Sequence, residues 1–332
     1  MTHSTPISFC FLLAPILSVL AQDLSAGLAG CTEVDCPNDG WDSCTVADES
    51  FAGIGLSGIT GVPNSLDDIS LVKGVHIEDS KDNDTHNGAD KTRSFRSVYY
   101  IGTPPNVDVD ELSGCAVVFN DPPTGHFPRP IINDSVNVDT RAAYGTCPDV
   151  IKQGCIDKLT DQARKTKYNG ANPCSTLQST LHNNPPDECS DLTGAGDGLG
   201  NFDVVSLGNL STISKSDNAS SKCWPVLPKS NNLAQLADDT AMGNYTNDGL
   251  LAEMYKITPV LTVFTSSNNS KSLVNETSAS LTCLKVVTTP NIDNGTDTDT
   301  DTDPGTGAAA LSTASMAVVT LGALATAMFA LL

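Results

Sequence analysis

The sequence predicts an α+β fold, namely a single disulfide-stabilised extracellular domain with short strands and a small helical unit, flanked by cleaved signal segments. Three observations favour this class. Ten cysteines lie between two apolar ends, short β-branched and aromatic runs are bounded by Gly, Pro and Asp, and one long segment has clear helix signals at both of its ends. The predicted domain, residues 31–289, is long enough to bury one sizeable core.

The N-terminal segment has the pattern of a secretory signal. An apolar run over residues 7–20 is followed by Ala21, which predicts a signal peptide over residues 1–21 and a mature chain that starts at Gln22. No Lys or Arg precedes the apolar run, so a buried core helix remains the alternative. Residues 22–30 are small and polar, and they form a predicted lead-in to the domain.

The cysteines predict a disulfide framework. Cys10 is lost with the signal peptide, and an even number in an exported chain implies up to five bonds, whose pairing the sequence leaves open. No Cys-x-x-Cys spacing occurs, so neither a zinc ribbon nor a thioredoxin-like site is expected. The ten framework cysteines are Cys31, Cys36, Cys44, Cys115, Cys147, Cys155, Cys174, Cys189, Cys223 and Cys283.

The first part of the domain combines a loop with a glycine-rich run. Residues 31–44 contain the turn signal Pro-Asn-Asp-Gly and predict a compact loop stapled by cysteines. Residues 53–58 match G-x-G-x-x-G. No apolar strand precedes this motif, and Pro63 follows where a helix should begin, so we do not expect a dinucleotide site. Residues 76–90 are polar and predict an exposed loop.

The remaining elements follow from local patterns. Residues 148–167 predict a helix, because Pro and Asp suit its first turn and Arg and Lys suit its last. Ile151, Cys155 and Leu159 recur every four residues and mark its buried stripe. A second helix over residues 175–182 completes a small unit held by cysteines. Weaker helix patterns occupy residues 233–242 and 248–255, and strands are predicted over residues 97–102, 115–120, 202–207, 260–265 and 279–287.

Sequons and charge limit the partners of the chain. A net charge of −21 disfavours nucleic acid and anionic membrane surfaces, which both require an excess of Lys and Arg. In an exported protein, Asn-x-Ser/Thr sequons on exposed loops are expected to carry N-linked glycan. Eight sequons occur, at Asn83, Asn133, Asn209, Asn218, Asn244, Asn268, Asn275 and Asn294.

The C-terminal segment predicts a glycosylphosphatidylinositol (GPI) anchor. A Thr-Asp repeat at residues 296–303 precedes small residues and then an apolar run over residues 317–332, which is the order of a GPI signal. The run is slightly shorter than the roughly 20 residues of a membrane span, and no Lys or Arg follows it. Residues 290–305 are the predicted stalk and residues 306–332 the removed propeptide, with Gly305 as the attachment residue and Gly307 as the second choice.

Several short motifs are spread over residues 99–287. They are Tyr100-Ile101-Gly102-Thr103-Pro104-Pro105, Asp110-Glu111-Leu112-Ser113-Gly114-Cys115, Gly145-Thr146-Cys147, Cys155-Ile156-Asp157-Lys158-Leu159, Cys174-Ser175-Thr176-Leu177, Cys223-Trp224-Pro225 and Leu281-Thr282-Cys283-Leu284-Lys285. Their order resembles that in a family of uncharacterised, cysteine-rich secreted proteins of filamentous fungi that carry GPI-anchor signals. The resemblance implies a location at the cell surface and carries over no catalytic residues.

The sequence offers candidate residues for two kinds of reactive site. No nucleophile elbow or H-E-x-x-H helix occurs, but paired carboxylates of a glycan hydrolase can come from Asp108, Asp110 and Glu111, with a solvated acidic loop as the alternative. A metal site can be formed around His76 and His86, but the EF-hand pattern fails because Asn87 takes the place of the loop glycine. The acidic residues between these histidines are Glu78, Asp79, Asp82 and Asp84.

The prediction is therefore a GPI-anchored fungal glycoprotein of the cell surface or cell wall, with a structural or interaction role and no enzymatic activity. The alternative is a surface-tethered glycan hydrolase that uses paired carboxylates. The expected partners are the membrane, through the GPI lipid, and cell-wall glycans. No cofactor and no nucleic acid are expected.

Overall fold

The computed structural model describes residues 28–37, 43–78, 92–120, 146–168, 172–190, 192, 198–215, 218, 220–244, 246–266 and 273–287. All of them belong to one compact unit, Met1–Asn294. The predicted signal peptide, stalk, propeptide and attachment glycines lie outside these residues. So do the sequons at Asn83, Asn133, Asn268 and Asn294, and the candidate metal ligands Asp79, Asp82, Asp84 and His86.

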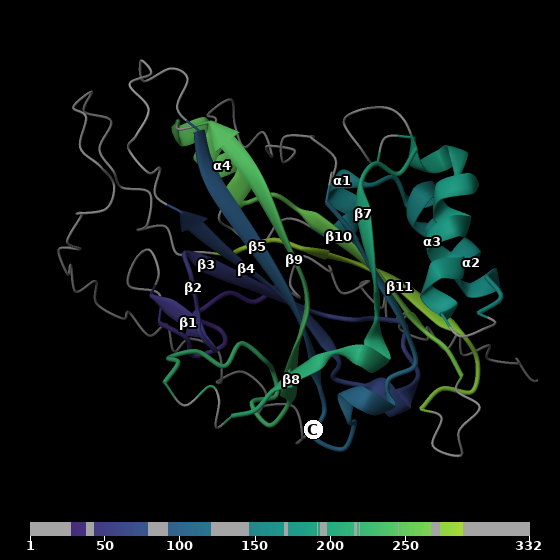
Figure 1. The fold of residues 1–332 in the computed structure, drawn as a ribbon, viewed down its shortest axis with the longest axis horizontal. Coiled ribbons are helices and arrows are strands. Elements are labelled where there is room, and N and C mark those ends of the chain that lie inside the picture. Colours follow the sequence, from purple (N-terminus) through teal and green to yellow (C-terminus); the bar gives the residue numbers. More distant parts are fainter. Residues whose placement is uncertain are drawn as a thin grey trace, which may run out of the picture. The chain divides into compact units, whose positions relative to one another are not determined.

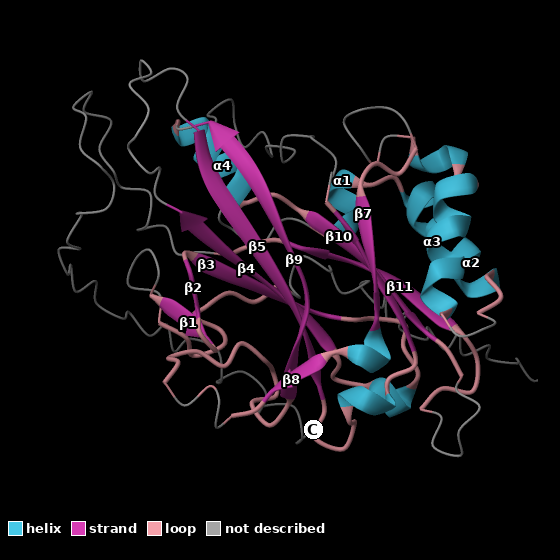
Figure 2. Cartoon of the chain, in the orientation of Figure 1, coloured by secondary structure: helices cyan, strands magenta, loops and turns pink. Residues whose placement is uncertain are grey.

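The described part of the chain is mostly antiparallel β-sheet with a few helices and several disulfides, which agrees with the coarse prediction (Figures 1 and 2). One sheet has five strands in the order β3-β4-β5-β9-β8, and a second has four strands in the order β11-β10-β6-β7. The five strands are β3 (Gly53–Gly58), β4 (Ser70–Glu78), β5 (Thr92–Thr103), β9 (Asn232–Asn244) and β8 (Ser211–Ile213). The four strands are β11 (Ser278–Leu284), β10 (Thr258–Phe264), β6 (Gly114–Phe119) and β7 (Phe202–Ser206).

The two large sheets pack face to face and form a sandwich. Their shared core contains Tyr99 and Ile101 from β5, together with Val118 and Val260 from the second sheet. Side chains alternate along a strand, so Val98 and Tyr100 point to the opposite face of the first sheet, where they join a different apolar cluster. The central strands β6 and β10 of the second sheet are buried along their whole length, which explains why their runs are mostly apolar rather than alternating.

A helical layer covers the outer face of the four-stranded sheet. It comprises α1 (Cys147–Val150), α2 (Gln153–Lys165), α3 (Pro173–Asn183) and the 3₁₀ turn Asp187–Cys189. Leu159 and Leu177 pack against Val117 and Leu261 of the sheet, and α3 lies beside β7 while α2 lies beside β11 (Figure 1). Asn172 caps α3 by accepting a hydrogen bond from the Ser175 backbone N–H at 3.3 Å. The prediction of a small helical unit is confirmed.

An N-terminal layer covers part of the outer face of the five-stranded sheet. We use this name for residues 28–36 together with the hairpin β1 (Cys44–Val46) and β2 (Glu49–Phe51). Phe51 meets Tyr100 of β5 edge to face, with ring centroids 6.3 Å apart. Ala29, in the predicted lead-in, forms an isolated β-bridge with Leu56 of β3. Residues 31–36 and Cys44 of this layer lie within the stretch that is predicted to be a cysteine-stapled loop.

The glycine-rich run of the nucleotide-like motif is a strand. Gly55 lies in β3, and a Cβ atom at that position would sit 1.7 Å from the carbonyl oxygen of Lys285. Ile54 forms a β-bridge with Val287, just beyond β11. The glycine is therefore required because two backbones pass close to each other where the edges of the two sheets meet.

Three local predictions are corrected by the structure. Residues 233–242 are not a helix but most of β9, because pairing with β5 and β8 outweighs the helix propensity of Ala, Leu and Gln. Residues 76–78 belong to β4, where they pair with residues 94–96 of β5, rather than to an exposed loop. The single helix over residues 148–167 is interrupted, because Lys152 is extended and forms the N-cap of α2. A short helix α4 (Asn247–Met254) is present where a weak one was predicted.

Candidate functional site: a buried four-cysteine cluster

Disulfides join eight of the predicted framework cysteines. Cys115 of β6 is bonded to Cys174 of α3, and Cys283 of β11 is bonded to Cys147 of α1, so two bonds tie the helical layer to its sheet. A third bond, Cys155–Cys189, lies within the layer. The fourth, Cys36–Cys223, joins the N-terminal layer to the loop that precedes β9.

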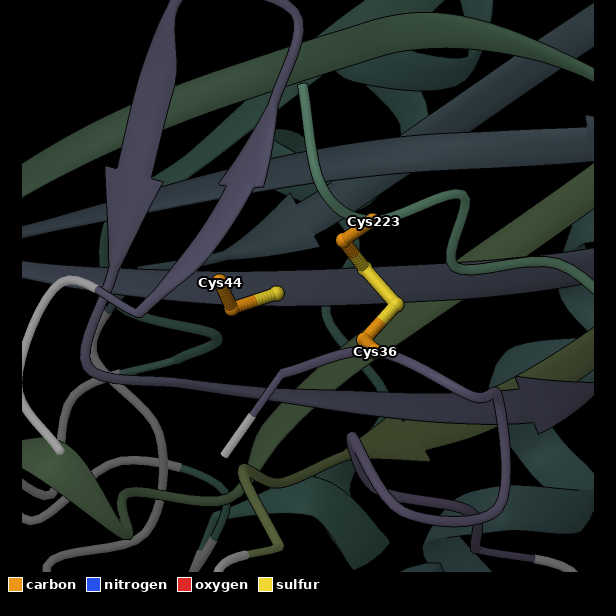
Figure 3. Close-up of side chains that lie close together, drawn as sticks. All are labelled: Cys36, Cys44 and Cys223. Carbon is orange, nitrogen blue, oxygen red and sulfur yellow. A yellow bond between two sulfur atoms is a disulfide. The ribbon is translucent and has the colours of Figure 1, made fainter. Parts of the chain in front are cut away.

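Around this fourth bond, four cysteines gather from three segments of the chain. The Cys44 sulfur lies within 4.8 Å of the sulfurs of both Cys36 and Cys223. In Figure 3 its thiol projects from the start of β1 toward that disulfide. The Cys31 thiol is hydrogen bonded to the Cys44 thiol. All four side chains are buried, and Cys31 and Cys44 expose only 2% and 1% of their surface.

Backbone hydrogen bonds fix the positions of these cysteines. A tight turn brings the Cys36 N–H to within 2.8 Å of the Cys31 carbonyl oxygen, and Asp35 takes a left-handed conformation (φ 47°) in that turn. The Cys223 N–H donates to the carbonyl oxygen of Thr45, next to Cys44, at 3.1 Å. Each half of the Cys36–Cys223 bond is therefore held by the backbone beside one of the two thiols.

The surroundings determine the chemistry of the two thiols. The hydrogen bond from its partner lowers the pKa of Cys31, while burial opposes this effect. The same hydrogen bond and burial both raise the pKa of Cys44, so this thiol stays protonated at neutral pH. Such a pair can be oxidised to a disulfide, whereas a metal centre formed by Cys36, Cys44 and Cys223 would first require reduction of the disulfide.

The three candidate carboxylates lie on one short turn. The 3₁₀ helix Val109–Glu111 begins after Asp108, whose carboxylate accepts a hydrogen bond from the Asp110 backbone N–H at 3.2 Å. Asp108 and Asp110 are exposed and Glu111 is partly buried. Asp108 therefore has a structural role, because it caps the start of this turn. Such a role fits the solvated acidic loop that the sequence allows as the alternative to paired catalytic carboxylates.

The described part of the candidate metal site consists of His76 and Glu78. Both lie on β4, two residues apart, and therefore on the same face of the strand. The His76 Nδ1 atom is 2.8 Å from the carbonyl oxygen of Ser50 on β2, so this ring nitrogen already serves the packing of the hairpin. Glu78 is exposed at the end of the strand.

Four of the sequons lie in the described residues, and they differ in exposure. Asn209, Asn244 and Asn275 are exposed. Asn218 is buried, with its Oδ1 accepting from the Ala47 N–H at 2.6 Å and its Nδ2 donating to the Cys223 carbonyl oxygen at 2.9 Å. A glycan is attached through Nδ2, so glycosylation of Asn218 would require this segment to leave its place in the structure.

Lys73 is a buried lysine that the sequence patterns did not predict. It lies on β4, facing the interior of the sandwich, and its Nζ donates to the Lys256 carbonyl oxygen at 2.8 Å and to Thr258 Oγ1 at 3.0 Å. Burial, with a smaller contribution from the Lys256 charge, lowers the pKa of Lys73 to about 7. The signal in the sequence is one Lys inside the otherwise apolar run of residues 71–75.

Beside Lys73, a tyrosine and a carboxylate are also perturbed. The Tyr99 hydroxyl donates to Thr258 Oγ1 at 3.2 Å, and burial raises the pKa of Tyr99 to about 12. Burial also raises the pKa of Asp239 on β9. These groups line the interior between the two sheets. Their hydrogen bonds join β4, β5 and β10, so they act as a polar link inside the sandwich.

A groove of about 470 Å³ lies between α2 and α3. Most of the residues that line it have charged or polar side chains, among them Lys158, Lys165 and Gln162. Lys158 lies 3.6 Å from Glu188 and Lys165 lies 2.6 Å from Asp161, so both ammonium groups face carboxylates of the same surface. Exposed pairs of this kind contribute little free energy.

Comparisons with protein-family models, with curated proteins and with solved structures find no match to this chain. Among the described residues, no helix has the length and apolar character needed to cross a membrane.

Proposed function

We propose that this chain is a disulfide-stapled fungal surface glycoprotein, exported by its N-terminal signal and held at the cell surface by a GPI lipid. Its role is structural or interactive, as a compact module displayed on an acidic, hydrated stalk. Residues 31–289 form its ectodomain. The partners we propose are the outer leaflet of the plasma membrane, through the lipid, and glycans of the cell wall.

The observation that carries this proposal is the pairing of eight framework cysteines in four disulfides. Structural disulfides persist in oxidising compartments and are rare where thiols are kept reduced. The exposure of Asn209, Asn244 and Asn275 supports the proposal further, because glycans need accessible asparagines. The acidic net charge is consistent with display at a hydrated surface.

The test is release of the protein from fungal cells by phosphatidylinositol-specific phospholipase C. We expect the released chain to start at Gln22 and to end at Gly305 or Gly307, as read by mass spectrometry of its terminal peptides. A variant with Gly305→Pro and Gly307→Pro is the matched control, which the phospholipase should not release. Retention of wild-type protein in membranes, together with recovery of the peptide over residues 317–332, would overturn the anchor.

The competing function is hydrolysis of wall glycans by Asp108, Asp110 and Glu111. The cap formed by Asp108 favours a structural reading of this turn. We expect no turnover of β-glucan or chitin by the purified ectodomain, and binding to members of a glycan array if the module is interactive. Turnover by wild type that is lost in Asp110→Asn, while Asp187→Asn stays active, would replace our proposal with the hydrolase.

A further inference from the structure

Cys31 and Cys44 are the two cysteines within the described residues that no disulfide joins. They lie in one apolar cluster with Val34, Phe51 and Tyr100, and their thiols are in hydrogen-bond contact. A buried thiol usually occurs as a small apolar side chain on its own. Here two thiols meet inside the same layer, and both belong to an even-numbered framework.

We propose that Cys31 and Cys44 form a fifth disulfide, which lies against Cys36–Cys223 and closes the N-terminal layer. Two adjacent disulfides would then connect three segments: the turn at residues 31–36, the start of β1 and the loop before β9. The proposal rests on the export that we propose above, because a reducing compartment would leave these cysteines as thiols.

The geometry favours this pairing over the other pairings of the four cysteines. Cys36 is already bonded to Cys223, and the backbone bonds from Cys36 to Cys31 and from Cys223 to Thr45 hold that arrangement. The thiol that contacts Cys44 without a bond of its own is Cys31. Closing the fifth bond requires the two contacting sulfurs to approach to about 2.05 Å, with no exchange of partners.

The fifth bond also protects the fourth. A thiolate attacks a disulfide sulfur through a mixed disulfide, and the Cys44 sulfur lies within 4.8 Å of both sulfurs of Cys36–Cys223. Before the layer closes and burial keeps Cys44 protonated, the Cys44 thiolate is a nucleophile that can exchange with that bond. Oxidation of the Cys31 and Cys44 pair removes this nucleophile and fixes the connectivity.

The oxidant that converts the Cys31 and Cys44 thiols to a disulfide is a protein disulfide. One thiolate of the pair attacks the disulfide of a thiol oxidoreductase in the secretory pathway, which releases a first oxidoreductase thiolate and forms a mixed disulfide. The second cysteine then displaces the other oxidoreductase sulfur. Two S–H bonds are broken and one S–S bond is formed, and the two protons and two electrons leave with the oxidoreductase as its dithiol.

Timing follows from burial. With 2% and 1% of their surfaces exposed, Cys31 and Cys44 are shielded from an oxidoreductase once the layer has closed. We therefore expect the bond to form during folding, before the turn at residues 31–36 packs against β1.

The test is disulfide mapping of the full, exported protein. The chain is denatured without reductant, its thiols are blocked with N-ethylmaleimide, and it is cut before aspartate residues. Trypsin is unsuitable because no Lys or Arg separates Cys31, Cys36 and Cys44. Cleavage before aspartate instead gives separate peptides, residues 23–34, 35–38, 42–47 and 217–237, with one cysteine in each.

We expect residues 23–34 to be linked to residues 42–47, and residues 35–38 to residues 217–237, with no N-ethylmaleimide on any of the four. Blocked thiols at Cys31 and Cys44, beside an intact Cys115–Cys174 bond, would overturn the fifth disulfide and leave the export proposal standing. Blocked thiols at all ten cysteines would instead contradict export. Zinc release on denaturation, with four blocked thiols in this cluster alone, would assign a metal centre in place of the two disulfides.

A second measurement uses variants. Cys31→Ser alone leaves Cys44 as a thiol beside Cys36–Cys223, so we expect a mixture of connectivities in which residues 42–47 are linked to residues 35–38 or 217–237. Cys31→Ser with Cys44→Ser removes both thiols and should restore one connectivity. If Cys31→Ser keeps only the link between residues 35–38 and 217–237, with Cys44 recovered as a blocked thiol, then Cys44 does not exchange and the protective role is overturned.

Discussion

The helical layer and the N-terminal layer cover opposite outer faces of the sandwich, and they are attached to it differently. Two disulfides bond the helical layer directly to strands of its sheet, at Cys115 of β6 and Cys283 of β11. The disulfide of the N-terminal layer, Cys36–Cys223, joins two loops and reaches no strand of either large sheet. The position of the bonds, more than their number, distinguishes the two layers.

In the N-terminal layer, polar contacts provide part of the attachment to the sheet. Arg96 of β5 pairs with Glu49 of β2 at 2.6 Å and with Asp238 of β9 at 3.0 Å, so it connects the hairpin with the sheet beneath it. Asn218 connects the β1–β2 turn at Ala47 with Cys223. Such contacts depend on the side chains that make them. The layer should therefore respond to single substitutions, while the helical layer should respond to loss of its disulfides.

The largest effect is expected from removal of Cys147–Cys283. The bond spans 136 residues, so its loss frees a long loop in the unfolded chain, and we expect Cys147→Ser with Cys283→Ser to lower the free energy of unfolding by about 4 kcal/mol. Urea titration of the two proteins measures it. Cys155→Ser with Cys189→Ser is the matched control, because that bond spans 34 residues inside the layer and should cost less. Equal losses of unfolding free energy would show that neither the loop length nor the attachment to the sheet makes Cys147–Cys283 the more stabilising bond.

A smaller effect is expected from Lys73, which lies inside the sandwich that carries both layers. Its pKa of about 7 in the folded protein is below the 10.5 of a free lysine, so folding favours the neutral amine. The unfavourable contribution is complete below pH 7, decreases as the pH rises, and is lost near pH 10.5. We expect wild type to gain roughly 4 kcal/mol from this group between pH 6 and pH 10, since one pKa unit is about 1.4 kcal/mol.

The control for this prediction is Lys73→Met. The variant should lack that rise in urea-unfolding measurements at pH 6 and pH 10, while titration of other groups remains the same in both proteins. The protection of backbone amides from hydrogen exchange should change by the same amount in α2 and in β1, because Lys73 lies in the sandwich between the two layers. Parallel pH profiles for wild type and variant would contradict the neutral state of Lys73.

A third prediction concerns Asn218 and affects only the N-terminal layer. Asn218→Ala leaves the Ala47 N–H and the Cys223 carbonyl group without their partner, so we expect a loss of about 2 kcal/mol and faster hydrogen exchange in β1 and β2. Ser220→Ala destroys the same sequon but keeps the asparagine. It should change neither stability nor glycan mass. A loss of one glycan in Ser220→Ala would show that Asn218 is glycosylated and that this segment is placed differently in the mature protein.

The smallest effect is expected from the exposed ion pairs. Arg96→Met should cost about 1 kcal/mol or less, because its guanidinium is partly exposed and its pairs are screened by solvent. Lys165→Met, which removes the exposed pair with Asp161 on α2, is the matched control in the helical layer. Hydrogen exchange in β2 should become faster for Arg96→Met and stay unchanged for Lys165→Met. Equal exchange rates in β2 of the two variants would contradict the proposed role of Arg96 in attaching the hairpin.

The parts of the fold that sequence predicts are those that local chemistry determines. The β-branched runs of β6 and β10 and the stripe of Ile151, Cys155 and Leu159 are confirmed, because they would bury apolar surface in almost any arrangement. The prediction of a helix over residues 233–242 was wrong because Ala, Leu, Gln and Met favour a helix locally. These residues form β9 instead, because they pair with β5, which lies more than a hundred residues earlier in the chain. Only the assembled sheet contains that information.

For the same reason, the sequence predicts the cysteines of the candidate site but not how they are paired. An even number of cysteines indicates a framework, but their pairing depends on which segments the fold brings together, as with Cys36 and Cys223 at a separation of 187 residues. Sequons are equally visible in the sequence, yet the burial of Asn218 depends on contacts with a hairpin far away in the chain. The role of Gly55 became clear only from the carbonyl oxygen of Lys285 beside it.

The most direct test of this account is hydrogen exchange of the oxidised protein, compared with the same protein after complete reduction under native conditions. Reduction should raise exchange in α2 and α3 more than in β1 and β2, while β5 and β10 stay protected, because the disulfides attach the helical layer to strands of the sandwich. Protection of α2 and α3 that survives reduction, with all thiols verified by mass, would contradict the claim that disulfides hold this layer.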